Sequence, residues 1–388
     1  MEFLSKRPRN LAKWRWLFLV GSLSLAFFLI FGSCEDPKDD WTTVPIDNNP
    51  NDTTVVPVDT VNNCWKFPIV TVRDQYYNQL FTRFGGGWTG SDGTLSIPLP
   101  DGSLLWIFGD TFLGTVNPNR SRPLSGLVNN TFAIQKGDDL TTLYGGTVLA
   151  PKAFVTPVEA GWWYWPGHGQ VNGDTLEVIM YAMRSNGGTM WSFEYAAVDL
   201  LKFSLPDVSL ISTERLVENP KVNWGTSVLA VGDYTYIYGA RKSGANKLLA
   251  VARCPKGSLS QKWEYYTGAA WSDDPAAVTG SFPKVSEQFT VFNRGNKFYL
   301  MTQNNALGKE IYLYSGNSPE GIFDGEKLLY CTPEAKGNIF TYNAFYHEAL
   351  STDDELCISY DVNSFDFQDV IKNADNYRPY FIRVKGWK

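Results

Sequence analysis

Two aspartates, Asp92 and Asp110, are the residues of this chain best placed to do chemistry. They flank the segment GTLSIPLPDGSLLWIFG, in which two strand-like runs surround a turn. If Pro100-Asp101-Gly102 forms a three-residue loop, Leu99 faces Ser103 and Asp92 stands directly across from Asp110. A two-residue turn at Asp101 would shift the pairing by one residue, and in both cases the two carboxyl groups share one end of the hairpin.

Two neighbouring carboxyl groups suggest acid–base chemistry. Each charge repels the other, so one group keeps its proton to higher pH while the other stays ionised. Hydrolysis of a glycosidic bond needs this combination, because one carboxyl group protonates the leaving oxygen and the other acts as base or nucleophile. We therefore predict Asp92 and Asp110 as catalytic residues, in unassigned order, with Glu287 as a third, assisting carboxylate. The alternative for each Asp is a structural role at a strand end.

The elements that must position these residues are β-strands. The sequence holds 34 Gly, 21 Pro, 14 Trp, 20 Tyr and 24 Phe, which is typical of strands joined by tight turns. Five segments, at intervals of roughly 60 residues, repeat a strand, a turn with Gly or Asp, and a second strand. These segments are GSDGTLSIPLPDGSLLWIFGDTF, HGQVNGDTLEVIMYAM, GTSVLAVGDYTYIYGA, FTVFNRGNKFYLMTQN and HEALSTDDELCISYDV.

The repeat predicts an all-β fold, a single five-bladed β-propeller over residues 64–388. Residues 70–84 are expected to complete the last blade beside residues 380–384 and so close the ring. Two β-sandwiches are the competing architecture, although they would not need five equivalent hairpins.

Further candidates come from the expected starts of the five hairpins, which a propeller gathers around its axis. Aromatic rings there can stack on sugars, and amides can bind hydroxyl groups. The alternatives are packing between blades for the aromatics near His168 and a hydrogen-bonded structural role for His347, which could otherwise hold an ion or orient a water. Arg83, Arg120 and Arg122 could engage an acidic sugar or be solvated loop charges. The predicted substrate-binding residues are Trp88, Phe112, Asn129, Asn130, Trp165, His168, Asn223, Trp224, Gln288 and His347.

The N-terminus predicts export. Five basic residues precede an apolar run over 16–31, and the following Cys34 sits in a sequence similar to a bacterial lipobox. We expect a signal peptide over 1–33, lipidation of Cys34 and a disordered acidic, Thr- and Pro-rich tether over 34–63. The triplet 38–40 resembles an export signal to the outer face of the outer membrane, so we expect a lipid-anchored, cell-surface protein. An uncleaved membrane anchor and a plain acidic linker are the alternatives.

Charge and cysteine content limit the partners. The formal net charge is −6, and the part after residue 33 carries 29 basic against 39 acidic residues, which argues against nucleic acid. An exported protein could pair the four remaining cysteines, although we expect buried free thiols. With two His in the chain and no CxxC spacing, a zinc site is not expected. We predict a monomer without a cofactor. The four cysteines are Cys64, Cys254, Cys331 and Cys357.

Three short motifs surround the two aspartates: GGWTGSDG over 86–93, WIFGDTFLG over 106–114 and LVNNT over 127–131. They resemble a group of secreted bacterial proteins catalogued as domains of unknown function, with five-bladed propellers, some of which are endo-D-arabinanases. The resemblance implies that Asp92 and Asp110 match the paired catalytic aspartates of that family. Related propeller glycosidases add a Glu from a later blade, which Glu287 matches by position. Some also hold calcium or a similar ion on the axis through a His in the fifth blade, which His347 could imitate.

The sequence therefore predicts a surface-tethered glycoside hydrolase that acts on a polysaccharide, with an arabinan-like furanose polymer as one candidate. A non-catalytic glycan-binding lipoprotein of a polysaccharide-utilisation system is the alternative from another class, and it predicts binding without turnover. A propeller that serves as a protein-interaction platform ranks third, because it would expose an apolar patch instead of paired carboxylates.

Overall fold

The computed structural model describes residue 64 and residues 68–123, 126–147, 149–188 and 192–388. The expected signal peptide, the lipidation site Cys34 and the tether lie outside these ranges. No helix among the described residues is long and apolar enough to cross a membrane. Strands dominate the described chain, which confirms the all-β prediction.

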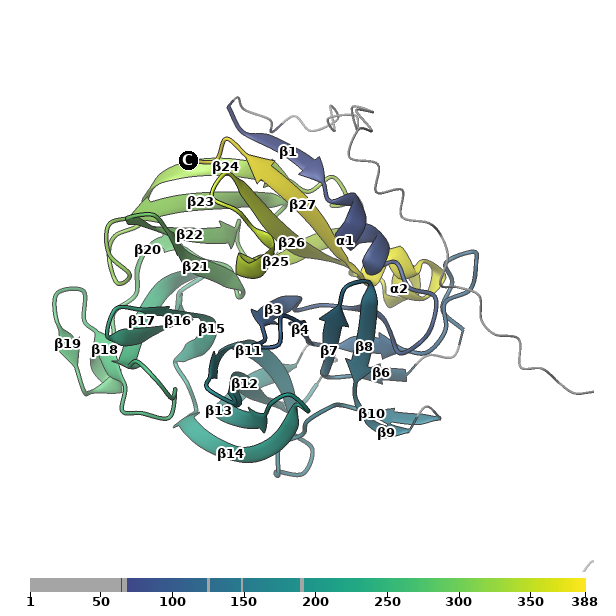
Figure 1. The fold of residues 1–388 in the computed structure, drawn as a ribbon, viewed down its shortest axis with the longest axis horizontal. Coiled ribbons are helices and arrows are strands. Elements are labelled where there is room, and N and C mark those ends of the chain that lie inside the picture. Colours follow the sequence, from purple (N-terminus) through teal and green to yellow (C-terminus); the bar gives the residue numbers. More distant parts are fainter. Residues whose placement is uncertain (1–63, 65–67, 124–125, 148, 189–191) are drawn as a thin grey trace, which may run out of the picture. The chain divides into compact units, whose positions relative to one another are not determined.

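Five antiparallel sheets of at least four strands make up most of the described chain (Figure 1). The first contains β3 (Leu95–Pro98), β4 (Leu104–Phe108), β7 (Thr131–Lys136) and β8 (Asp139–Leu143). The second contains β11 (Trp163–Asn172), β12 (Thr175–Ser185), β13 (Phe193–Ser204) and β14 (Ser209–Glu218). The third contains β15 (Val222–Val231), β16 (Tyr234–Ser243), β17 (Asn246–Pro255), β18 (Glu264–Tyr266), β19 (Trp271–Ser272) and β20 (Ser281–Lys284).

The last two sheets bring the chain back to its beginning. The fourth contains β21 (Phe289–Arg294), β22 (Lys297–Gln303), β23 (Glu310–Gly316) and β24 (Asp324–Cys331). The fifth contains β25 (Ile339–Tyr346), β26 (Glu355–Ser364) and β27 (Pro379–Lys385), with β1 (Val70–Arg73) at its edge. The first strands of successive sheets contact one another from β3 through β11, β15 and β21 to β25, so the sheets lie around a common centre (Figure 1).

Smaller elements complete the described chain. A three-stranded sheet contains β2 (Trp88–Ser91), β5 (Thr111–Leu113) and β6 (Gly126–Val128), and a two-stranded sheet contains β9 (Gly145–Thr147) and β10 (Ala150–Lys152). The α-helices are α1 (Gln75–Leu80) and α2 (Phe367–Lys372), each with an Asp side chain that caps its N-terminus. The 3-10 helices span Pro275–Ala277, Glu348–Leu350 and Ala374–Tyr377.

The sheets bury both of their faces, and β12 shows how the sequence achieves this. Its apolar run is continuous, and alternate side chains point to opposite faces of the sheet. Val178 and Met180 pack in a cluster with residues of the first sheet, such as Leu95. Ile179, between them, packs with residues of the third sheet, such as Ile237. A strand of this kind buries apolar surface against the sheets on both sides of its own, which stabilises their packing.

The two ends of the described chain close the fifth sheet. β1 pairs with β27 from Val70 opposite Lys385 to Arg73 opposite Ile382, so the first residues of the expected segment 70–84 do join this sheet, whereas Gln75–Leu80 form α1 instead of a strand. A disulfide between Cys64 and Cys331 joins the residues before β1 to the end of β24. The prediction of free thiols is therefore wrong for this pair. It is confirmed for Cys254 and Cys357, and burial raises the pKa of each thiol to about 12.

The expected start of the fifth hairpin is also wrong. We placed it at His347, but the first strand of this sheet is β25, so His347 follows that strand and begins the connection to β26. The ring of His347 has no exposed surface and forms hydrogen bonds with Ser96 of β3 at 2.7 Å and Ser359 of β26 at 2.9 Å. His347 therefore links the first and fifth sheets in the interior, and its placement at a substrate-binding mouth does not hold.

The buried ring of His347 should make the stability of the protein depend on pH. Burial lowers the pKa of His347 from 6.5 to about 3, so below pH 6.5 the unfolded chain binds a proton that the folded protein does not. The stability that this provides is present above pH 6.5 and is lost as the pH falls toward 3. Between pH 7 and pH 5 we expect His347 to account for a loss of about 2 kcal/mol in the free energy of unfolding.

Urea unfolding of the wild type and of His347→Gln at both pH values measures this contribution. The glutamine amide can still bond to the two serine hydroxyls, but it does not titrate. The loss between pH 7 and pH 5 should be smaller in the variant by the amount above, and an equal loss in both proteins would refute the assignment.

Candidate functional site

The two aspartates lie where the first hairpin is interrupted. Asp92 connects β2 to β3, and Asp110 connects β4 to β5. The same register runs through both parts of the ladder, with Ser91 opposite Thr111 and Leu95 opposite Ile107. The Asp92 N–H donates to the Asp110 carbonyl at 3.3 Å, and the Gly109 N–H donates to the Asp92 carbonyl at 2.8 Å. The two aspartates therefore face each other, as expected.

The turn at the other end of the hairpin sets this register. The Leu99 N–H donates to the Ser103 carbonyl at 2.9 Å, which confirms the three-residue loop. The Asp101 carboxylate accepts from the Ser103 N–H at 3.0 Å and holds the loop together. Asp101 is thus a turn residue at the end away from the candidate site.

Two glycines allow the aspartate-bearing segments to approach. Gly93 has φ of +67°, a conformation that favours glycine, and it turns the chain directly after Asp92. A Cβ atom at Gly109 would lie 2.5 Å from Oδ1 of Asp92. The sequences Asp92-Gly93 and Gly109-Asp110 therefore place both carboxyl groups in a space that a larger residue would fill.

Asp92 is held by two tyrosines from the last part of the chain. Its Oδ2 accepts from the hydroxyl of Tyr342 in β25 at 2.6 Å and from that of Tyr377, just before β27, at 3.1 Å. Asp92 keeps part of its surface exposed. Burial, followed by the charges of Asp110 and Asp361, raises the pKa of Asp92 well above its usual range, and the two hydroxyl donors oppose this only in part.

Asp110 has different neighbours. Its Oδ1 accepts from the indole N–H of Trp165 at 2.8 Å and from the amide of Asn129 at 3.1 Å. Burial raises the pKa of Asp110, and these two N–H donors stabilise the ionised form. The repulsion between Asp92 and Asp110 acts on both groups, whereas the further negative charge of Asp361 raises the pKa of Asp92. Of the pair, Asp92 is the better placed to keep a proton.

Trp165 and Asn129 are therefore the predicted binding residues that the structure brings to the aspartate pair. Both are partly exposed. The ring of Trp165 packs edge-on against that of Phe193, with the ring centres 4.8 Å apart. The centre of the Trp163 ring lies 6.0 Å from that of Trp165. An aromatic surface thus borders the Asp110 side of the site.

Several other predicted binding residues are buried and cannot line a mouth. Trp88 has no exposed surface and packs in a cluster with Phe81 and Phe108. Phe112 and Trp224 are almost as buried. Every residue of β2 and of β5 is buried, so proximity in sequence to Asp92 and Asp110 did not imply exposure.

Asn130 is also buried, so it cannot line a substrate-binding opening. Its side-chain amide donates to the carbonyls of Val155 and Tyr164, both at 3.0 Å, and its Oδ1 accepts from the Val155 N–H. Asn129 and Asn130 are adjacent, yet one contacts the aspartate pair and the other joins the first sheet to the second.

Glu287 lies outside direct contact with either aspartate. Its carboxylate pairs with Lys247 at 2.7 Å and accepts from the amide of Asn223 at 3.0 Å. The hydroxyl of Thr226 lies 3.0 Å from the hydroxyl of Tyr181 in β12 and donates to the backbone carbonyl of Glu287 at 3.4 Å. Tyr181 is opposite Trp165 in the second sheet, so these hydrogen bonds connect the backbone of Glu287 to the strand paired with that of Trp165.

His168 and Gln288 form hydrogen bonds with the backbone. Nδ1 of His168 accepts from the Val228 N–H at 3.2 Å, and burial lowers the pKa of His168 to about 4. The amide of Gln288 donates to the carbonyl of Asn343 at 3.2 Å. These contacts connect neighbouring sheets.

Arg122 is a buried residue and not a solvated loop charge. Its guanidinium group donates to the Thr89 hydroxyl at 2.8 Å and stacks 4.3 Å from the centre of the Phe112 ring. Burial and the charge of Arg378 lower the pKa of Arg122 to about 9. Because Thr89 belongs to β2, Arg122 supports the strand that leads to Asp92.

Three residues near Asp92 were not predicted from the sequence: Tyr342, Tyr377 and Asp361. Asp361, in β26, has no exposed surface and accepts from the Gly93 N–H at 2.6 Å and the Thr94 hydroxyl at 2.8 Å. No motif marks these residues, and they lie about 250 residues or more from Asp92 in sequence. Only the closure of the fifth sheet against the first brings them together.

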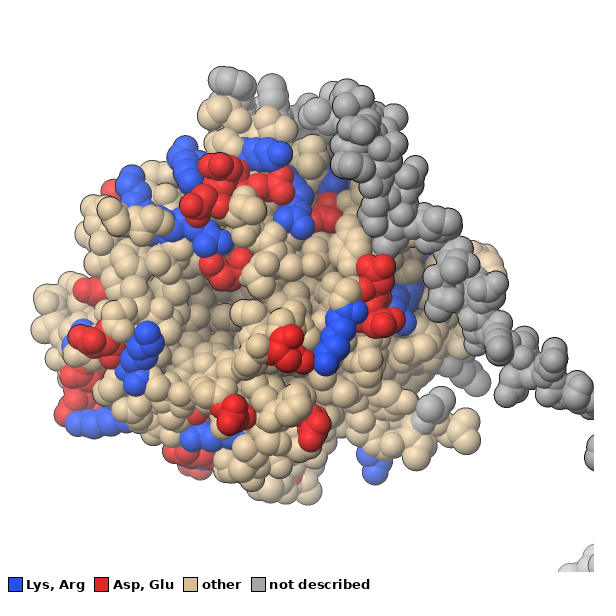
Figure 2. All heavy atoms as spheres, in the orientation of Figure 1, with Lys and Arg blue, Asp and Glu red and all other residues tan. Residues whose placement is uncertain are grey.

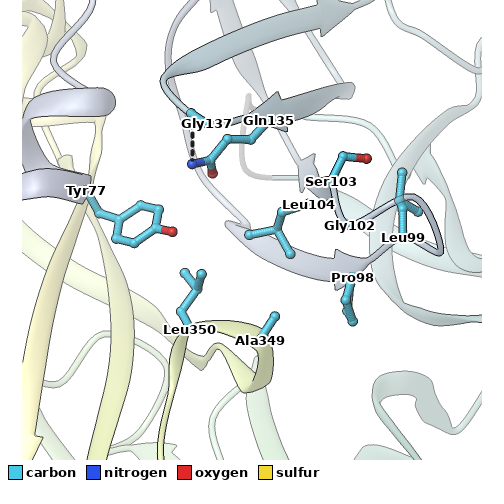
Figure 3. A pocket seen from close by; sticks show the side chains of 10 residues that line it. All are labelled: Tyr77, Pro98, Leu99, Gly102, Ser103, Leu104, Gln135, Gly137, Ala349 and Leu350. Atoms are coloured by element: carbon cyan, nitrogen blue, oxygen red, sulfur yellow. Dashed lines mark hydrogen bonds between the residues drawn. The ribbon is translucent and has the colours of Figure 1, made fainter.

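The structure offers no obvious metal centre in the part of the chain that it describes, since no cluster of three or more His, Cys, Asp or Glu residues there could hold a metal ion. A separate cavity of about 210 Å³ lies near the turn end of the first hairpin (Figure 3). Tyr77 and Leu350 face Pro98 and Leu104 across it, and none of the predicted site residues lines it. On the face shown in Figure 2, acidic and basic side chains are interspersed, so this face carries no extended basic patch for nucleic acid.

Comparisons with known proteins give the family and the fold. A family profile described as a domain of unknown function, DUF5005, matches residues 74–387. A structure from Bacteroides ovatus ATCC 8483, provisionally described as a hydrolase, matches with a TM-score of 0.73 at 24% identity over 84% of this chain and 93% of that chain. An α-L-arabinofuranosidase from Podospora anserina in complex with cellotriose gives a TM-score of 0.44 at 10% identity over 78% of this chain and 92% of that chain. No curated protein matches the chain.

The close approach at Gly109 can be tested by adding a single methyl group. In Gly109→Ala the new Cβ atom must displace the Asp92 carboxylate, and we expect a loss of about 1–3 kcal/mol in the free energy of unfolding. Gly85→Ala is the matched control, because its Cβ atom meets nothing closer than 4.0 Å and its φ is not positive. Urea unfolding should show a change within about 0.5 kcal/mol for this control. Equal stability of the two variants would mean that the segments are not packed as described.

Proposed function

The chain belongs to the DUF5005 family, and we propose that it is a glycoside hydrolase that cleaves a polysaccharide with Asp92 and Asp110 as its catalytic pair. The observation that carries the proposal is the placement of two partly exposed aspartates directly opposite each other, with different hydrogen-bond donors around each carboxyl group. A protonated acid beside an ionised carboxylate is the arrangement that glycosidic bond hydrolysis requires.

The surroundings of each group support an assignment of roles. Asp92, beside two further carboxylates, acts as the general acid that protonates the leaving oxygen. Asp110, with N–H donors from Trp165 and Asn129, acts as the base or nucleophile. The exposed part of the Trp165 ring offers a surface on which a sugar can stack, and Glu287, farther away, assists through contacts with the substrate.

The architecture supports the same proposal. Five sheets in sequence order, with their first strands in contact around a centre and β1 closing the fifth sheet, are what a five-bladed propeller requires. Such a fold gathers one end of each first hairpin around the axis. The substrate that we propose is a furanose-rich polysaccharide such as an arabinan, because the motifs around Asp92 and Asp110 resemble those of endo-D-arabinanases.

We further propose that the enzyme works at the cell surface of a bacterium. The basic and apolar N-terminus, followed by Cys34 and an acidic, Thr- and Pro-rich stretch, is typical of a lipoprotein whose catalytic part is held away from the membrane by a tether. A lipid anchor would hold the protein beside large polysaccharides that cannot enter the cell.

Product release from a panel of plant, bacterial and mycobacterial polysaccharides tests the function. We expect the domain over residues 64–388 to release oligosaccharides from at least one of them, and Asp92→Asn and Asp110→Asn each to lower the rate by at least about 100-fold. Asp101→Asn, at the opposite end of the same hairpin, should leave the rate unchanged, because the asparagine Oδ1 can still accept from the Ser103 N–H and keep the turn. Hydrolysis that survives both site substitutions would contradict the proposal, as would binding of a polysaccharide without any release of product.

The indole of Trp165 should set the lower pH limit of activity. Trp165→Phe removes an N–H donor from Asp110, which raises the pKa of Asp110, so a higher pH is needed to ionise the base. The acid limb of the kcat/KM pH profile should therefore move to higher pH. Trp163→Phe is the control, because the Trp163 N–H is buried without a hydrogen-bond partner. If both variants keep the wild-type acid limb, Asp110 is not the group that must be ionised.

A further inference from the structure

Asp361 is a buried carboxyl group, and no cation among the described residues forms an ion pair with it. It has no exposed surface, and burial raises its pKa to about 7. The groups that most stabilise its charge are hydrogen-bond donors of Gly93, Thr94 and Asn343. A buried carboxylate without a counter-ion is destabilising, so its presence calls for a role beyond packing.

The contacts of Asp361 converge on Asp92 from two directions. Its carboxylate accepts from the Gly93 N–H at 2.6 Å and from the Thr94 hydroxyl at 2.8 Å, and these two residues form the turn directly after Asp92. Across the sheet, Asp361 is opposite Tyr342, whose hydroxyl donates to Asp92 at 2.6 Å. Asp361 thus binds the backbone next to Asp92. It also lies opposite Tyr342, the residue that donates to the Asp92 carboxyl group.

The charge of Asp361 also acts on Asp92. The titratable groups around Asp92 are Asp110 between β4 and β5, Tyr342 in β25, Asp361 in β26 and Tyr377 before β27. Burial raises the pKa of Asp92 most, followed by the charge of Asp110 and then the charge of Asp361. No cation among the described residues is a main influence on this pKa. The Asp361 carboxylate binds Gly93 and Thr94, the two residues that directly follow Asp92. We therefore expect its charge to act more strongly on Asp92 than on Asp110.

We propose that Asp361 is a positioning residue that orients Asp92 through the Gly93–Thr94 turn and determines which carboxyl group of the pair holds the proton. It does not touch the reacting atoms, because it is fully buried. The role of Asp361 in catalysis rests on the function proposed above. The effect of Asp361 on the protonation of Asp92 does not depend on that function. The two can therefore be tested separately.

The test is an NMR titration of the domain labelled with ¹³C at the aspartate carboxyl carbons. The Asp92 resonance is assigned by its absence in Asp92→Asn, and the midpoint of its titration is compared between the wild type and Asp361→Asn. Removing the negative charge should move this midpoint to lower pH by about one pH unit. If hydrolysis has been found, the alkaline limb of the kcat pH profile should move in the same direction, because a general acid must be protonated to act.

Glu177→Gln is the matched control. Glu177 is also almost fully buried, but it pairs with Lys202 and Ser258, near the turn of another hairpin. Its substitution should leave the Asp92 titration in place, even if it lowers stability. If Asp361→Asn does not fold, Thr94→Val removes one donor to Asp361, which makes Asp361 harder to ionise and should move the Asp92 midpoint in the same direction by a smaller amount.

The possible results separate the two claims. An unchanged Asp92 midpoint in a folded Asp361→Asn variant, or in Thr94→Val if that is the one that folds, overturns the inference whatever the protein hydrolyses. A lowered kcat with an unshifted pH profile would also overturn it, because a merely structural defect has that signature. If the midpoint moves but no polysaccharide is cleaved, the inference about Asp361 stands and the proposed function fails.

Discussion

The backbone pairing of Asp92 with Gly109 and Asp110 is the interaction on which the site depends. Strand pairing usually continues without interruption, but here a left-handed glycine and a second glycine open the ladder while its register is retained. Two carboxyl groups can then occupy the space where bulkier side chains would otherwise lie. The three-residue turn at the far end of the hairpin fixes the register, so the chemistry at one end is determined by the loop at the other.

Closure of the fifth sheet provides the environment for this pair. Because β1 pairs with β27, the last strands of the chain lie beside the first hairpin. They contribute the hydroxyls of Tyr342 and Tyr377, the buried Asp361 and the internal His347, which bonds to both the first and the fifth sheets. The second sheet contributes Trp165 to the other aspartate. The difference between the two carboxyl groups arises from which sheet each one faces.

Local sequence patterns predicted the hairpin well, because the spacing of the turn and of the two aspartates defines a register without reference to distant residues. The pairing of the segment that begins at Val70 with β27 could also be predicted, because a propeller needs its last sheet to be closed by a strand from the start of the chain. Exposure was harder to predict. Trp88 and Phe112 were expected to line a substrate-binding opening because they are near the aspartates, but the strands that carry them are buried along their whole length. His347 was assigned to the start of a strand because the turn-rich residues after it resemble those of the other hairpins. Tyr342, Tyr377 and Asp361 come from the far end of the chain, and no short motif encodes their approach.

The most direct test of the account is a crystal structure of Asp92→Asn soaked with oligosaccharides from the polysaccharide that the domain binds or cleaves. The substitution slows hydrolysis, so an intact substrate can be seen. We expect a glycosidic oxygen within hydrogen-bond distance of residue 92, with Asp110 on the opposite side of the bond and a sugar ring against Trp165. A saccharide bound away from both residues, for example in the cavity beside Tyr77 and Leu350, would contradict the central claim that the aspartate pair is the active site.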